Sequence, residues 1–200
     1  MSLKNYKHKD LIEVGCDEAG RGSLCGPVVA AAVILPKDFA NNDLNDSKKI
    51  SLKKRNELSV IIYNEALACE IGIVNPKEID KINILQASIL SMHKAIEKIT
   101  LPFELILVDG PHFNKYKNYN HECIIRGDSK YQAIAAASII AKTYRDKLMN
   151  KIHVDYPQYK WSRNKGYPTP EHRKAIINFG ITNHHRKSFK LINNQTTLNI

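Results

Sequence analysis

Two adjacent carboxylates, Asp17 and Glu18, follow a short apolar run and precede a glycine-flanked arginine, Arg21. Neighbouring carboxylates repel each other unless a cation lies between them, and hard oxygen ligands favour Mg²⁺ or Mn²⁺ over zinc. Gly20 and Gly22 have no side chain, so their backbone N–H groups and Arg21 can approach a polyanion closely. The stretch therefore indicates a divalent metal site beside a phosphate-binding loop.

Two further acids, Asp109 and Asp128, follow the apolar runs 104–108 and 122–125. Each acid also has an ordinary explanation: the first pair as a solvated strand end, Asp109 as part of a turn, and Asp128 as the N-cap of a helix. If all four converge, some of their pKa values rise strongly, and two divalent cations would keep them ionised. The spacing alone leaves both interpretations open.

Six stretches, taken in order, resemble the motifs of the type 2 ribonucleases H, specifically the bacterial ribonuclease HII family. They are Asp17-Glu18-Ala19-Gly20-Arg21-Gly22, Asp46-Ser47-Lys48-Lys49, Val108-Asp109-Gly110, Gly127-Asp128-Ser129-Lys130, the alanine-rich run 135–142 with Arg145-Asp146, and Lys165-Gly166-Tyr167-Pro168-Thr169. A chance match to one such motif is common, but an ordered series is hard to explain otherwise. The resemblance covers about residues 11–190.

The resemblance implies a catalytic tetrad of Asp17, Glu18, Asp109 and Asp128 that holds Mg²⁺ or Mn²⁺. It also implies an endoribonuclease that hydrolyses the RNA strand of RNA/DNA hybrids. Such an enzyme cuts 5′ of single ribonucleotides in duplex DNA and leaves a 5′-phosphate and a 3′-hydroxyl. Ribonucleotide excision repair is its expected use.

The same resemblance implies three groups of substrate-binding residues. The backbone of Gly20-Arg21-Gly22 would touch the 2′-hydroxyl of the ribonucleotide, and Arg21 would hold a phosphate. Tyr167 would stack on the deoxyribose that follows, and Ser47 and Lys48 would contact phosphates. The plainer interpretations are a tight turn, a half-buried ring and a solvated charge run.

Two other patterns concern charged residues near the C-terminus. Lys142 and Asp146 lie at helical spacing, which predicts a surface ion pair. The segment 184–189 resembles the family's His-Arg-Arg-Ser-Phe sequence, with Lys187 in place of an arginine. Lysine keeps the positive charge but lacks the fork geometry with which arginine binds phosphate.

Alternating apolar runs and amphipathic stretches predict an α/β protein, a mixed sheet with helices on both faces and a small C-terminal helical appendage. The resemblance implies that this sheet is ribonuclease H-like. We expect strands at 11–16, 27–35, 68–74, 104–108 and 122–125, and helices at 51–67, 76–99, 130–152 and 171–179. Residues 1–155 would form the catalytic domain and 156–200 a basic substrate-binding segment. In the latter, aromatic residues alternate with cations, which favours a nucleic-acid surface; the aromatic residues are Tyr156, Tyr159, Trp161 and Tyr167.

The 200-residue chain carries a formal net charge of +10, which favours an acidic partner such as nucleic acid. Its apolar runs are too short to span a membrane, and its four cysteines lack paired spacing, so we expect a cytoplasmic protein. We also expect a monomer. Two alternatives remain: another nuclease or strand-transfer enzyme on the same fold, or a non-catalytic basic nucleic-acid-binding protein. The Gly20-Arg21-Gly22 loop and Tyr167 favour the ribonuclease, because a DNA-only enzyme has no 2′-hydroxyl to sense.

Overall fold

The computed structural model describes residues 3–44 and 50–192, in which strands alternate with helices. The elements are β1 (Glu13–Ala19), β2 (Val28–Ile34), α1 (Leu52–Glu65), β3 (Ala68–Val74), α2 (Pro76–Ile96), β4 (Leu105–Asp109), β5 (Asn120–Ile124), the 3-10 turn η1 (Gly127–Ser129), α3 (Gln132–Asp155), the 3-10 turn η2 (Pro157–Tyr159), α4 (Trp161–Asn164) and α5 (Pro170–Phe179). None of the helices in the described part of the chain has the length and apolar character of a membrane span.

The strands form one mixed sheet in the order β3-β2-β1-β4-β5. β1 and β2 are antiparallel and joined by a short loop, whereas β1 and β4 are parallel. Parallel neighbours need a long crossover connection, and the chain between β1 and β4 includes α2. The mixed α/β sheet predicted from the sequence is confirmed.

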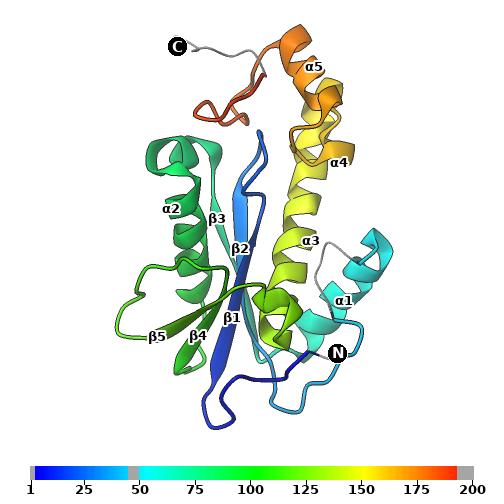
Figure 1. Ribbon diagram of the computed structural model, residues 1–200. Coiled ribbons are helices and arrows are strands. Elements are labelled where there is room, and N and C mark those ends of the chain that lie inside the picture. The colour runs from blue at the N-terminus through cyan, green and yellow to red at the C-terminus, as the bar shows by residue number, and fades with distance from the viewer. Residues whose placement is uncertain (1–2, 45–49, 193–200) are drawn as a thin grey trace.

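Helices cover both faces of this sheet (Figure 1). α2 packs against β2 and β3 on one face, while α3 packs against β1 and β2 on the other, with α1 beside it. All seven residues of β2 are buried as a result. Ala30 and Ala32 belong to the core cluster that contains Met92 of α2, and Ala31 belongs to the cluster under α3.

The alanine-rich start of α3 allows this helix to lie unusually close to β1. A Cβ atom at Gly15 would lie 2.3 Å from the carbonyl carbon of Ala133, a distance that real contacts do not reach. Ala135, Ala136 and Ala137 are all fully buried. The small side chains therefore set the distance between the helix and the strand that carries the acidic pair.

Most elements differ from their predicted bounds by one to three residues, and the differences at β1 and α2 have a clear physical reason. β1 continues to Ala19, past the acidic pair, because its pairing with β2 continues to Ala19 opposite Val29. α2 ends at Ile96 and is interrupted at Asn83, whose φ is 65° and whose side chain accepts hydrogen bonds from the N–H groups of Leu85 and Gln86. Asn83 thus acts as a second N-cap inside the predicted helix.

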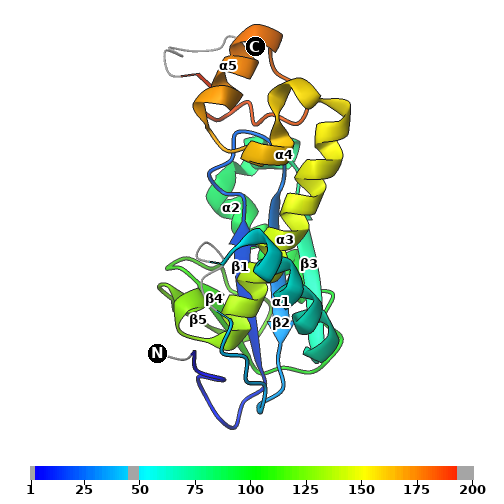
Figure 2. The same cartoon turned by 90° about the vertical axis from the view of Figure 1, so that its right-hand side faces the viewer.

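After α3, residues 156–192 form a C-terminal segment at the end of the sheet where β1 turns into β2 (Figure 2). Its core contains Tyr159 and Trp161, which are 1% and 0% exposed. The same cluster includes Leu24 and Cys25 of the β1–β2 loop and Met149 of α3. The segment therefore packs directly on the loop that follows the acidic pair. The division at residue 155 into two domains stays a prediction.

Candidate active site

The acidic pair lies where the parallel strands separate. β1 pairs with β4 only as far as Cys16 opposite Val108, whereas its pairing with β2 continues through Asp17 and Glu18. Beyond Cys16, the β4 side of β1 therefore has no strand partner among the residues that the structure describes. Asp17 is buried, and its carboxylate oxygen accepts a 2.6 Å hydrogen bond from the N–H of Glu18.

The other two predicted acids lie on the neighbouring strand and on the turn that follows β5. Asp109 is the last residue of β4, and its carboxylate accepts a 2.7 Å hydrogen bond from the N–H of Gly127. That bond joins the end of β4 to η1, which carries Asp128. Asp128 is 7% exposed and follows the bonded glycine directly.

One cleft brings most of the predicted site residues together. It has a volume of about 370 Å³, within the range of ligand sites. Its lining residues are Asp17, Glu18, Ala19, Gly20, Arg21, Gly22, Asp109, Ser138, Lys142 and Tyr167. Three of the four predicted acids thus share a cleft with the glycine-rich loop and the predicted stacking tyrosine. Asp128 does not line the cleft; it follows Gly127, whose N–H donates to the Asp109 carboxylate.

The electrostatics of the cleft favour the uptake of positive charge. Burial raises the pKa of Asp17 well above its ordinary value, and repulsion from Glu18 and Asp109 adds to the rise. A hydrogen bond from Ser138 opposes this shift. Burial also raises the pKa of Glu18, although the Arg21 guanidinium, 3.3 Å from its carboxylate, acts in the opposite direction. A cation between these groups would relieve both the repulsion and the cost of burial.

The donor set suits a hard divalent cation, because it consists of carboxylate oxygens. Within residues 3–44 and 50–192, no group of three or more His, Cys, Asp or Glu side chains is arranged closely enough to form a complete metal site. Asp17 and Asp109 each direct a carboxylate oxygen to a backbone N–H instead. The residues therefore match the chemistry of a metal centre without forming a closed ligand shell.

The start of the 20–27 loop and Tyr167 form another part of the cleft wall. Gly166 has a φ of 79° and lies against this loop, where a Cβ atom would be 2.5 Å from the carbonyl oxygen of Cys25. The N–H of Leu24 donates to the Gly166 carbonyl at 2.8 Å. The turn thereby holds Tyr167 beside the loop, and its ring lies 5.3 Å from the Lys142 ammonium nitrogen.

The sequence analysis did not assign Ser138, Lys142 and Arg145 of α3 to the site. Ser138 and Lys142 line the cleft, and Arg145 is fully buried directly behind it. Their spacing of four and three residues places them on one face of a helix, the face turned toward β1 and the 20–27 loop. That periodicity was the available signal, but nothing in the sequence showed which helix face meets the cleft.

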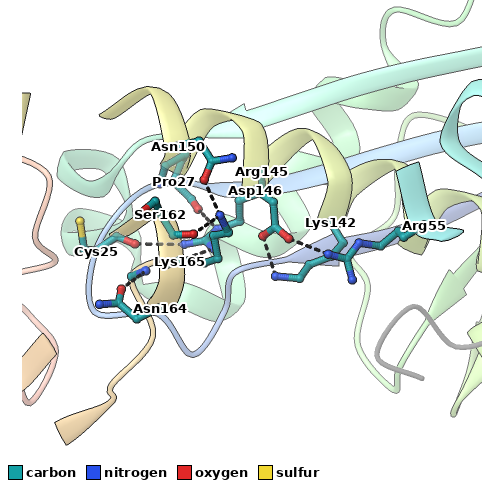
Figure 3. Close-up of polar contacts among 11 residues, drawn as sticks. Cys25, Pro27, Arg55, Lys142, Arg145, Asp146, Asn150, Ser162, Asn164 and Lys165 are labelled. Atoms are coloured by element: carbon teal, nitrogen blue, oxygen red, sulfur yellow. Dashed lines mark hydrogen bonds and ion pairs between the residues drawn. The ribbon is translucent and has the colours of Figure 1, made fainter. Parts of the chain in front are cut away.

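The predicted ion pair between Lys142 and Asp146 is present at 2.7 Å, but its predicted surface location is wrong. Asp146 is 5% exposed and also accepts a 2.8 Å bond from Arg55 (Figure 3). The buried carboxylate is thereby neutralised from two helices. This pairing directs the Lys142 ammonium group along the edge of the cleft.

Two predictions about nucleic-acid contacts have different outcomes. Tyr159 and Trp161 are buried core residues, so the predicted binding surface made of these rings is wrong. The stretch containing Ser47 and Lys48 lies outside the described residues, and the phosphate contacts assigned to them stay predictions. Tyr167 remains the aromatic residue of this region that lines the cleft.

A mixed five-stranded sheet with carboxylates at the ends of two adjacent parallel strands defines a ribonuclease H-like nuclease fold. The chain is similar to the RNase HII in the PCNA:RNase HII complex from Archaeoglobus fulgidus, with 26% identity, a TM-score of 0.77 and coverage of 94% of this chain and 98% of that chain. Bst-RNase HIII in complex with Mn²⁺ has the same fold, with a TM-score of 0.69 and 17% identity, over 90% of this chain and 68% of that chain.

The ribonuclease HII family model matches residues 14–192. The ribonuclease HII of Bacteroides thetaiotaomicron is 56% identical over 190 residues, which are 95% of each chain. The chain belongs to the ribonuclease HII family, and it is a ribonuclease H endonuclease. The family depends on divalent metal ions and acts on RNA/DNA hybrids. The family, fold and activity predicted from the sequence motifs are confirmed.

Proposed function

We propose that this chain cuts 5′ of single ribonucleotides in duplex DNA, as well as within RNA strands of hybrids, and uses Asp17, Glu18, Asp109 and Asp128 to hold Mg²⁺ or Mn²⁺. The observation that carries the proposal is the shared cleft. Three of these acids line it together with the glycine-rich loop and Tyr167. An acidic cluster by itself does not select among nucleases of this fold, whereas a neighbouring loop with bare backbone donors favours recognition of a ribose.

The chain's own residues have distinct parts in this reaction. The acids would hold the divalent cations beside the cleaved phosphodiester, and Arg21 and Lys142 supply positive charge to flanking phosphates. The loop at Gly20-Arg21-Gly22 approaches the 2′-hydroxyl, and Tyr167 stacks on the following deoxyribose. Divalent cations held there would supply the activation of a water nucleophile and the stabilisation of the departing oxygen, and the products would be a 5′-phosphate and a 3′-hydroxyl.

A single-ribonucleotide duplex tests this function. The protein is incubated with duplex DNA carrying one ribonucleotide, in Mg²⁺, in Mn²⁺ and in EDTA, and the cut is mapped on a sequencing gel. We expect one cut on the 5′ side of the ribonucleotide in the presence of metal and none in EDTA. The same duplex with a deoxyribonucleotide at that position is the control and should stay intact.

The rival functions give different results in the same assay. Cleavage of the all-DNA control would indicate another nuclease on this fold. Binding that survives EDTA, with no cut in either metal, would indicate a non-catalytic nucleic-acid-binding protein. We also infer a cytoplasmic monomer that serves ribonucleotide excision repair, and size-exclusion chromatography with light scattering checks the monomer directly.

A further inference from the structure

The C-terminal segment is paired directly with the 20–27 loop, although more than 150 residues separate them in the sequence. Cys25 and His185 form an antiparallel bridge. The N–H of Gly26 donates to the His184 carbonyl at 2.8 Å, and the N–H of Arg186 donates to the Leu24 carbonyl at 2.9 Å. The loop beside the acids is therefore held from one side by residues 184–186.

The Arg186 side chain extends this pairing to the start of the loop. Its guanidinium donates to the carbonyl oxygens of Gly20 at 2.7 Å, Arg21 at 2.8 Å and Gly26 at 3.0 Å. Arg186 is fully buried, whereas Arg21 and Gly22 are exposed. Arg186 is also absent from the lining of the cleft. The guanidinium thus lies behind the loop, on the side away from the acids.

These bonds determine how two peptide units of the loop are turned. In a trans peptide the C=O and the N–H point in opposite directions. The Gly20 carbonyl shares its peptide unit with the N–H of Arg21, and the Arg21 carbonyl shares its unit with the N–H of Gly22. Because both carbonyls face Arg186, both N–H groups face the opposite side of the loop, which lines the cleft.

The two N–H groups are available to a ligand. Among the hydrogen bonds of the described residues, none uses the N–H of Arg21 or of Gly22. At Gly20, φ is 97°, and a Cβ atom would lie 2.0 Å from the Nε atom of Arg145. The loop therefore has a backbone shape that needs glycine, and buried guanidinium groups support it from behind.

We infer that Arg186 is a positioning residue for ribose recognition: it aims the N–H groups of Arg21 and Gly22 into the cleft, where they bind the 2′-hydroxyl oxygen. The inference rests on the proposed function, because it assigns the loop's ligand to the ribonucleotide at the cut. It also gives a role to the segment 184–189, which resembles the family's His-Arg-Arg-Ser-Phe sequence. Arg186 acts from behind the loop, through backbone carbonyls.

Arg186→Lys tests the inference, because a lysine keeps the positive charge but cannot reach three carbonyls with a rigid fork. Two quantities are measured in Mg²⁺: KM for the single-ribonucleotide duplex, and Ki of the matched all-DNA duplex as a competitive inhibitor. We expect KM to rise about tenfold, since misdirecting two backbone donors weakens two hydrogen bonds to the ribose. Ki should stay unchanged, because the all-DNA duplex lacks that oxygen.

Arg173→Lys is the matched control. Arg173 also donates to two backbone carbonyls of the C-terminal segment, those of Lys190 at 3.0 Å and Leu191 at 2.6 Å, but it does not touch the 20–27 loop. Its KM and Ki should match those of the unaltered protein. A purely structural role for Arg186 would lower the active fraction, and hence kcat, with KM unchanged.

A second variant serves if Arg186→Lys does not fold. Asp80 of α2 accepts bonds from the N–H groups of Lys187 at 2.9 Å and Ser188 at 3.0 Å, next to Arg186. Asp80→Ala should loosen this anchor and raise KM in the same direction, by a smaller factor. An unchanged KM in a folded variant, or an equal rise of KM and Ki, overturns the inference. Failure of the unaltered protein to cut the ribonucleotide duplex would instead overturn the proposed function.

Discussion

Buried charge is compensated differently in two parts of the cleft. The sheet wall carries Asp17, Glu18 and Asp109, and the loop wall consists of the 20–27 loop and Tyr167 with the residues that support them. On the sheet wall, burial and the nearby carboxylates of Glu18 and Asp109 raise the pKa of Asp17. On the loop wall, the buried guanidinium groups of Arg145 and Arg186 each donate to three backbone carbonyls. A bound cation would therefore stabilise the ionised carboxylates of the sheet wall, whereas the buried guanidinium groups of the loop wall already have hydrogen-bond partners.

This difference indicates a catalytic role for the buried acids and a structural role for the buried arginines. A carboxylate without a counter-charge destabilises the fold, so its presence in a buried cleft indicates a functional role. A guanidinium that saturates backbone carbonyls stabilises the loop and has few donors left for a phosphate. Substitutions in the two walls should therefore act on different quantities: activity for the acids, and stability or loop geometry for the arginines.

The largest effect is expected from Asp17→Asn, which keeps the shape of the side chain and removes its charge. Cleavage should fall roughly 10³-fold or more, because the variant loses a carboxylate that would hold the divalent cations. Binding of the duplex should persist, since the basic surface is unchanged. Single-turnover cleavage and an anisotropy titration measure the two, and retained cleavage would remove Asp17 from the mechanism.

Arg145→Met should mainly lower stability. The substitution leaves the carbonyls of Cys25, Pro27 and Lys165 without their partner, and unpaired buried polar groups cost about 1–3 kcal/mol each, so we expect a loss of about 3 kcal/mol or more. Chemical denaturation measures the free energy of unfolding. Lys147→Met, at an exposed position of the same helix, is the control and should change it little.

Tyr167→Ala tests the part of the loop wall that faces the substrate. Loss of one stacking ring should lower cleavage of a single-ribonucleotide duplex about 10- to 100-fold, the range expected for about 1–3 kcal/mol of stacking. Tyr167→Phe keeps the ring and should retain most activity. A long RNA/DNA hybrid should be affected less than the single ribonucleotide. An equal loss on both substrates would indicate that Tyr167 serves folding instead.

The smallest expected effect is a pH dependence of stability from the sheet wall. An acid whose pKa is raised in the folded state binds its proton more tightly there than in the unfolded chain. In EDTA, stability should therefore fall as pH rises from about 3.8 through the raised pKa of Asp17, with a limiting slope of about 1.4 kcal/mol per pH unit. Thermal melts across pH measure this slope. Mg²⁺ or Asp17→Asn should reduce it, and an unchanged slope in Asp17→Asn would assign it to another group.

Local pattern was sufficient to predict most elements of the fold. Ser51 and Pro76 mark the starts of α1 and α2, because capping and a fixed proline φ act within one turn of a helix. The break at Asn83 was not predictable in the same way, since an asparagine also occurs within helices on exposed faces. Its positive φ of 65° and the bonds of its side chain to the N–H groups of Leu85 and Gln86 are visible only in the structure.

The sequence by itself determined the family, because side-chain type and ordered spacing carry that information directly, and it supplied the four acids as a prediction. Only the tertiary structure decided that Tyr159 and Trp161 belong to the core, that Asp146 is buried between two cations, and that Arg186 lies behind the loop. The physical reason is the same in each case. Burial and hydrogen-bond partners depend on residues far away in the chain, and aromatic and charged side chains have the same spacing whether they face water, substrate or the interior.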